Sequence, residues 1–133
     1  MFKTTFFALA TFATLALGAS PSETAADEAS IAGNALRTTL SGKTVYLKIS
    51  GFELPIRYSA GGSMTGRMSM DTAASARVQA ADRGNWWISD GQLCQRWTSW
   101  MDGKSYCFKL TIRGKAVSWV RNDGRKGTAR IGG

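Results

Sequence analysis

The stretch GNWWISDGQLCQRWTSWMDGKSYCF, residues 84–108, decides the fold of this chain of 133 residues. It contains four of the five tryptophans and both cysteines, and it includes two Asp-Gly pairs. Side chains alternate between polar and apolar over 92–99 and again over 104–113, which is typical of strands with one buried and one solvated face. The stretch therefore predicts a β-hairpin closed by a short loop.

Cys94 and Cys107 are the only cysteines in the chain, so they can form just one intramolecular disulfide. If they lie opposite each other in the hairpin, Arg96 faces Ser105. Both cysteines have the parity of the polar face, which predicts a disulfide on the outside of the sheet. A redox role is not expected, because no second thiol lies at Cys-x-x-Cys spacing. The opposite parity places these aromatic and aliphatic residues in the core: Trp97, Tyr106, Phe108, Leu110 and Ile112.

The tryptophans of this stretch divide between core and surface. Trp86 and Trp87 are adjacent, so within a strand they point to opposite faces, and one of them is expected outside. The outward one could stack on a sugar or base, or pack against an arginine through a cation-π contact. Trp100 falls in the loop, where it is either a lid over one end of the fold or an exposed contact residue.

From Lys43 onward, polar and apolar side chains alternate with a period of two in most segments, which indicates further short strands. Pro55 cannot donate a ladder hydrogen bond, which places its strand at an edge or a bulge. The inward positions of 63–70 include Met64, Met68 and Met70, which we interpret as core filling. Residues 71–83 could form a helical turn or two, or a long loop. Strands are expected at 43–50, 52–58, 63–70, 85–89, 92–99, 104–113, 116–121 and 127–131.

Eight short strands joined by turns predict an all-β domain, as an antiparallel barrel or curled meander, because closure removes exposed edges. A two-sheet sandwich is the alternative. The interior is expected to be filled by Trp97, Tyr106, Phe108 and the methionines.

The N-terminus, MFKTTFFALATFATLALGAS, predicts a secretory signal peptide over residues 1–19, because its apolar run is too short for a permanent membrane anchor. Residues 20–42 are expected to be a flexible lead-in with a short helix over Ile31–Leu40, and residues 43–133 a single β domain. The expected location is the periplasm or the exterior, with no integral membrane span after cleavage.

After loss of residues 1–19, sixteen lysines and arginines remain against nine acidic residues, a formal charge of +7. This surplus favours an anionic polymer, lipopolysaccharide or a periplasmic protein as partner, although solubility alone can explain a charged surface. The candidate binding residues combine aromatic side chains of the opening stretch with basic side chains of the outer face. They are Trp86, Trp87, Trp100, Arg57, Arg67, Arg96, Lys109 and Arg113.

Histidine is absent, which removes histidine metal sites and Ser-His or Cys-His nucleophile pairs. The acids of the three Asp-Gly pairs are explained by turn chemistry. Glu53, Asp71 and Asp82 remain, and their spacing does not pair them. We therefore expect no catalytic residues, no metal ligands and no cofactor.

These observations favour a non-enzymatic, envelope-associated binding or accessory protein with a preference for anionic partners. The alternative is a periplasmic enzyme inhibitor or stress partner that inserts a loop, for example the Trp100 loop. A carrier of apolar ligands would need a hollow barrel.

The runs GNWWISDGQLCQRW, GKSYCF and NDGRKGTARI together resemble a group of small exported proteobacterial proteins of unknown function. The shared pattern is G-x-W, L-C-x-x-W and a second cysteine before an aromatic residue, and it covers about residues 84–131. This resemblance implies a fold and carries no known chemistry. A weaker similarity is to the disulfide-stapled barrels that inhibit lysozyme in the periplasm, although the positive charge would repel a cationic lysozyme.

Overall fold

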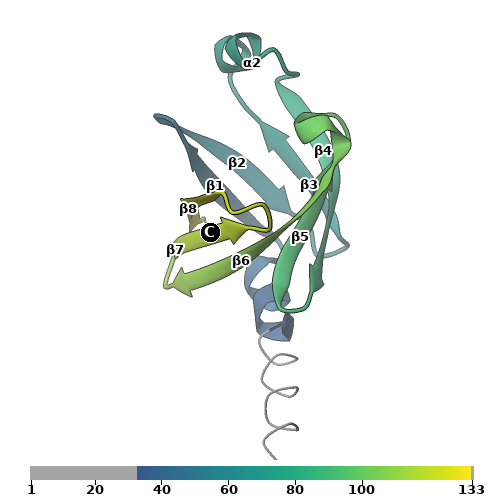
Figure 1. The fold of residues 1–133 in the computed structure, drawn as a ribbon, viewed down its shortest axis with the longest axis vertical. Helices are drawn as coiled ribbons and strands as arrows, with labels where there is room; N and C mark the ends of the chain where they lie inside the picture. Colours follow the sequence, from purple (N-terminus) through teal and green to yellow (C-terminus); the bar gives the residue numbers. More distant parts are fainter. Residues whose placement is uncertain (1–32, 133) are drawn as a thin grey trace, which may run out of the picture.

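The computed structural model describes residues 33–132, and within them eight antiparallel strands form a closed barrel (Figure 1). Each strand pairs with the next, and the last pairs with the first. The predicted barrel is therefore confirmed in preference to the sandwich. The predicted signal peptide and most of the lead-in lie outside the described residues. The strands are β1 (Lys43–Ile49), β2 (Phe52–Tyr58), β3 (Ser63–Arg67), β4 (Ala81–Ser89), β5 (Gln92–Trp97), β6 (Ser105–Arg113), β7 (Ala116–Arg121) and β8 (Lys126–Ile131).

The hairpin of β5 and β6 has the predicted register. Cys94 pairs with Cys107 and Arg96 with Ser105, and the two cysteines form a disulfide. Cys94 has no exposed surface although it has the parity of the outer face. Asp90 and Gly91 form the two-residue turn between β4 and β5, and both have positive φ, as an Asp-Gly hairpin turn requires.

Removal of this disulfide gives the first testable prediction. Replacing both cysteines with serine should lower the free energy of unfolding by about 3 kcal/mol, because the bond closes a short loop in the unfolded chain. Urea denaturation monitored by tryptophan fluorescence measures the change. A double variant as stable as the wild type would show that the bond does not stabilise the fold.

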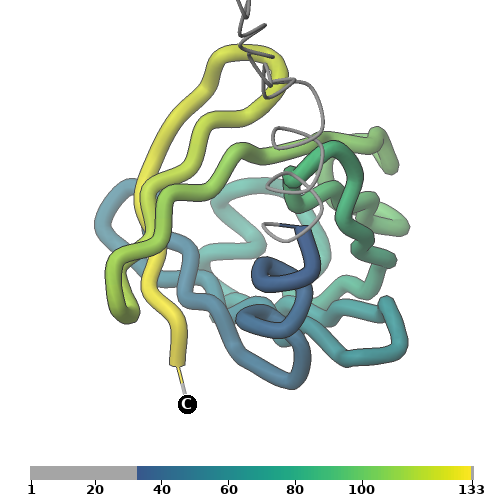
Figure 2. The backbone as a smooth tube through the Cα atoms, turned by 90° about the horizontal axis from the view of Figure 1, so that it is seen from below, coloured from purple at the N-terminus to yellow at the C-terminus, as the bar shows by residue number. Residues whose placement is uncertain are grey.

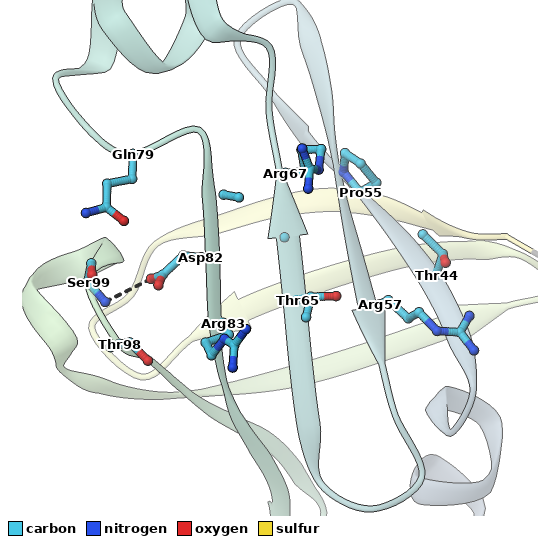
Figure 3. A pocket seen from close by; sticks show the side chains of 12 residues that line it. Thr44, Pro55, Arg57, Thr65, Arg67, Gln79, Asp82, Arg83, Thr98 and Ser99 are labelled. Atoms are coloured by element: carbon cyan, nitrogen blue, oxygen red, sulfur yellow. Dashed lines mark hydrogen bonds between the residues drawn. The ribbon is translucent and has the colours of Figure 1, made fainter.

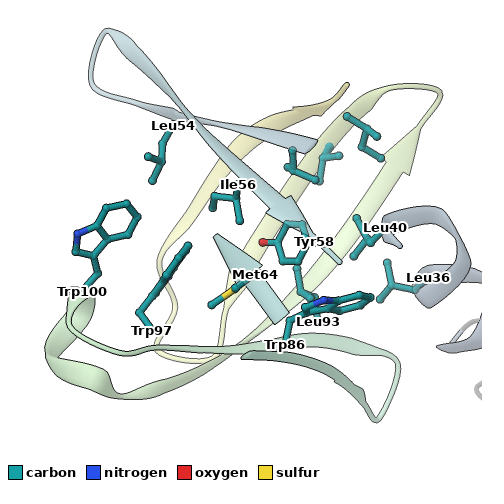
Figure 4. Packing of buried hydrophobic residues seen from close by; sticks show 13 residues of the cluster. Leu36, Leu40, Leu54, Ile56, Tyr58, Met64, Trp86, Leu93, Trp97 and Trp100 are labelled. Carbon is teal, nitrogen blue, oxygen red and sulfur yellow. The ribbon is translucent and has the colours of Figure 1, made fainter. Parts of the chain in front are cut away.

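The helix of residues 33–40 closes one end of the barrel, where it lies across the opening in Figure 2. Its Leu36 and Leu40 belong to the same buried cluster as Tyr58 and Trp86 (Figure 4). This helix confirms the predicted one over its described part. No helix within residues 33–132 is long and apolar enough to cross a membrane.

The other end of the barrel carries a second helix, α2 (Met70–Ala76), and here the strand prediction was wrong. β3 ends at Arg67, because Ser69 caps the helix by accepting a hydrogen bond from the Thr72 amide (3.1 Å). Met70 is consequently 76% exposed instead of filling the core. The methionines continue the strand pattern to residue 70, but the helix cap formed by Ser69 and Thr72 ends the strand before it.

Pro55 lies where the ladder between β2 and β3 ends. The two strands pair only from Ile56 to Tyr58, whereas β2 pairs with β1 along its whole length. The edge position expected for Pro55 is therefore confirmed on the side of β2 that faces β3, although the barrel as a whole is closed. Between Pro55 and Phe52, at the start of β2, the strand is not paired with β3. The tip of the β1–β2 hairpin therefore has no strand neighbour on the β3 side (Figure 1).

Candidate anion-binding groove

A row of alternating arginine and threonine side chains crosses the outer face of the barrel. Arg57 of β2 lies opposite Thr65 of β3, which lies opposite Arg83 of β4. On one side the row continues to Thr44 of β1, which lies opposite Arg57. On the other side it continues to Thr98, just after β5, and the Thr98 amide donates to the Arg83 carbonyl. Arg57 and Arg83 are thus two strand spacings apart, roughly 10 Å. The short Thr65 side chain between them leaves room above the sheet.

These residues border a groove of about 680 Å³ (Figure 3). Arg67 and Pro55 line its end toward α2, where the ladder between β2 and β3 has ended. The groove therefore follows from a proline that ends the ladder and from small side chains on β3, and three guanidinium groups lie along it.

The three arginines of the groove lack carboxylate partners. Within residues 33–132 the only ion pairs are Arg121 with Asp123 and Arg130 with Glu53. The Arg57 guanidinium makes one long contact, 3.5 Å from Nη1 to the Gly42 carbonyl. Three full positive charges are therefore available to an incoming anion.

One acidic side chain, Asp82, also lines the groove. Its Oδ2 accepts hydrogen bonds from the backbone amides of Ser99 (2.8 Å) and Trp100 (2.7 Å). Asp82 thereby holds the turn η1 (Trp100–Gly103) against the start of β4. This carboxylate is engaged with backbone donors, and the ionisable side chains of the groove still carry a net charge of +2.

Of the five basic residues predicted to bind anions, Arg57 and Arg67 line the groove and the others do not. Arg96 is diagonal to Arg83, and its Nε donates to the Gly103 carbonyl (2.8 Å), so it anchors the turn η1. Lys109 and Arg113 lie on β6, outside the groove. The structure thus brings together two of the predicted cations instead of five.

Arg83 was missed because the strand expected from the sequence began at Asn85, whereas β4 begins at Ala81. The outward alternation of Arg83, Asn85 and Trp87 was a usable signal. The intervening Gly84, which has no side chain to mark the inner face, obscured it.

The tryptophans divide as parity requires. Trp86 is 2% exposed and donates to the Ser59 carbonyl (2.8 Å), and Trp87 is 37% exposed on the outer face. The expected cation-π pairing of the outward tryptophan is not found, since the pairs within the described residues are Arg37 with Trp86, Arg121 with Tyr106 and Arg130 with Tyr46.

Trp100 is buried, 6% exposed, so it is not available as an exposed contact. Its ring lies 4.7 Å from that of Trp97, centroid to centroid, and its Nε1 donates to the Gln79 carbonyl (2.8 Å). Of the two interpretations this position fits the lid, but the ring covers the wall over Gly66 at the α2 end and does not close that end of the barrel. This position also removes the residue on which loop insertion into an enzyme relied.

The three unassigned acids lie in separate environments. Glu53 pairs with Arg130, Asp71 is in the first turn of α2, and Asp82 accepts the two amides described above. No cluster of three or more potential metal-ligating side chains occurs within residues 33–132. The hydrogen bond from the adjacent Arg121 side chain lowers the pKa of the Asp123 carboxyl group to about 2.

Comparison of the chain with protein-family models, with curated protein sequences and with solved structures gives no significant match. The resemblance to exported proteobacterial proteins and the similarity to lysozyme-inhibitor barrels therefore stay predictions. A function has to be inferred from the groove and the barrel themselves.

Proposed function

We propose that this protein is an exported, non-enzymatic β-barrel that binds an anionic polymer through the groove of Arg57, Arg67 and Arg83. One observation carries the proposal: three guanidinium groups without carboxylate partners border a single hollow on a rigid sheet. The predicted signal peptide and the disulfide agree with export to an oxidising compartment such as the periplasm.

The groove suits a repeating anion better than an isolated one. A guanidinium presents its N–H donors in a planar fork that matches the oxygens of phosphate, sulfate and carboxylate groups. Arginines on both sides of Thr65, roughly 10 Å apart, can contact successive anionic groups of one chain. Because the backbone positions are fixed by the β ladders, little order has to be gained on binding beyond that of the arginine side chains.

The surplus of positive charge on the whole domain assists this groove. Without the predicted signal peptide, the chain has 16 lysines and arginines against 9 acidic residues. Such a surplus attracts polyanions over distances comparable to the Debye length and raises the rate of encounter, whereas the groove supplies the local contacts. Affinity should consequently fall steeply as salt is added.

The test compares two triple variants of equal charge on heparin resin. Replacing Arg57, Arg67 and Arg83 with glutamine should make the protein elute at lower salt than a control in which Lys109, Arg113 and Lys115 are replaced. All three control residues are exposed and lie outside the groove. The slope of log affinity against log salt should also fall by roughly 3 for the groove variant, about one per lost contact.

Equal elution of the two triple variants would show that net charge alone causes retention. Failure of the wild type to bind heparin or lipopolysaccharide resin at low salt would refute the proposal outright.

A further inference from the structure

The interior of the barrel contains a second hollow, which shares no lining residue with the arginine groove. It has a volume of about 510 Å³, within the range of small-molecule sites, and lies at the α2 end. Its wall is apolar and aromatic, and includes Phe52, Met68, Trp97, Phe108 and Trp119. The expectation of a filled interior was therefore wrong at the α2 end, whereas the interior toward the helix of residues 33–40 has a cavity of only about 50 Å³. Eight-stranded barrels are wide enough to hold one small ligand.

The hollow exists because a large side chain lies flat against the wall. Trp119 of β7 pairs with Gly127 of β8, and a Cβ atom on that glycine would lie 2.5 Å from the Trp119 Cζ2. The indole thus occupies the space over a missing side chain instead of extending across the barrel. Ala129, the next inward residue of β8, is also too small to fill the centre.

The hollow is closed at one end and open at the other. Leu36 and Leu40 of the N-terminal helix block the far end of the barrel (Figure 4). At the α2 end, the rim is formed by Ile49 and Phe52 of the β1–β2 hairpin tip and by α2 with the following Val78. A ligand would therefore enter between this hairpin and α2, from the side opposite the helix of residues 33–40.

The inner wall carries few polar groups, and one of them, Trp119 Nε1, is a buried donor without a hydrogen-bond partner among the described residues. More polar groups line the mouth. Inside, the Tyr58 hydroxyl donates to Gln95 Oε1 (2.8 Å), and burial raises the pKa of Tyr58, so it stays protonated. At the mouth, Arg121 lies among the lining residues, with its guanidinium 4.3 Å from the Tyr106 ring centroid and bound to Asp123. Thr72 and Ser75 of α2 add hydroxyl groups to the same rim.

We propose that this hollow binds a single-chain amphiphile, with its alkyl chain inside the barrel and its polar head at the mouth beside Arg121. A chain that enters covers aromatic and aliphatic surface that otherwise stays partly open, which is favourable in proportion to the apolar area removed from water. The polar rim solvates the head. The site does not rest on the anion-binding groove, which lies on the outer face.

Dodecanoate, below its micellar concentration, is the probe. Titration calorimetry of the full chain should give saturable binding of one dodecanoate per protein, and the tryptophans of the wall should report it by fluorescence. The heat of binding should become more negative with temperature, as burial of apolar surface requires.

Two variants reduce the hollow in different ways. Gly127→Val should force the Trp119 ring into the interior and lower the affinity at least tenfold. Ala76→Phe places a ring at the exposed rim, where the fold is under less strain, and should lower affinity by a similar factor. Val120→Ser is the control, because Val120 is 48% exposed on the outside of the same strand as Trp119. Circular dichroism checks that each variant is folded.

Three results would overturn this proposal: no saturable binding to the wild type, unchanged affinity in a folded Ala76→Phe variant, or an equal loss in Val120→Ser. The variant lacking Arg57, Arg67 and Arg83 should bind dodecanoate as the wild type does. Loss of binding there would place the carboxylate on the outer groove and likewise contradict the interior site.

Discussion

Replacing Gly84 with alanine is expected to lower the free energy of unfolding by at least about 3 kcal/mol, at the upper end of the cost of overpacking a core. The added Cβ would lie 2.1 Å from the Arg96 backbone oxygen and 2.8 Å from the Met64 Cε. The methionine can move, but the carbonyl belongs to β5 and is fixed by the pairing of Gly84 with Trp97. Relief therefore requires that β4 and β5 separate.

Gly61→Ala is the matched control for this prediction. A Cβ added to Gly61 would have no atom within 4 Å, and the φ of this residue is not positive, so the variant should be as stable as the wild type. Thermal and urea unfolding of both variants give the comparison. A Gly84→Ala variant with an unchanged midpoint would mean that β4 and β5 do not approach as closely as described.

Replacing Trp100 with alanine should cost about 3–5 kcal/mol, the usual range for removal of a large buried aromatic side chain. The ring packs against Trp97 and fills the space over Gly66, where a Cβ would lie 2.6 Å from the Trp100 Cζ3. The variant also loses the hydrogen bond from the indole to the Gln79 carbonyl. This result distinguishes a structural lid from an exposed contact.

Trp87→Ala is the control for Trp100→Ala. Because Trp87 is partly exposed on the outer face, its replacement should lower the free energy of unfolding by much less. If Trp100→Ala unfolds at the same urea concentration as Trp87→Ala, Trp100 is not part of the core. An inhibitor that inserts this loop into an enzyme would again become a serious alternative.

The hairpin could be predicted from the sequence because local rules agree there. Alternation placed Trp97 inside, cysteine parity set the register of β5 and β6, and an Asp-Gly pair gave the turn before β5. The prediction of a closed barrel followed from the number of strands and the shortness of their connections, and it is confirmed.

The site was harder to predict because it depends on where strands stop pairing. Pro55 indicated an edge, but the sequence could not show that the ladder to β3 ends beside it and leaves a groove. Arg83 was hidden by the glycine that follows it. Arg96, Lys109 and Arg113 share the outward parity of the groove residues, yet parity specifies a face of the sheet and not a place on that face.

The interior was mispredicted for a related reason. Counting inward aromatic residues suggested that they fill the barrel, because each was assumed to point toward its centre. Trp119 and Trp100 were not among the expected filling residues. Trp119 lies over Gly127 and Trp100 over Gly66, so these two large side chains cover gaps in the wall. Whether a large residue crosses a barrel or covers a neighbouring glycine depends on cross-strand register, which alternation alone does not give.

The most direct test of the proposed function is a nuclear magnetic resonance titration of the nitrogen-labelled protein with a heparin-derived tetrasaccharide. Binding at the groove predicts that the largest amide shifts fall on residues 56–58, 64–67 and 81–84, and that they disappear when Arg57, Arg67 and Arg83 are replaced with glutamine. Shifts concentrated on β6 to β8, or spread evenly over all basic residues, would contradict it.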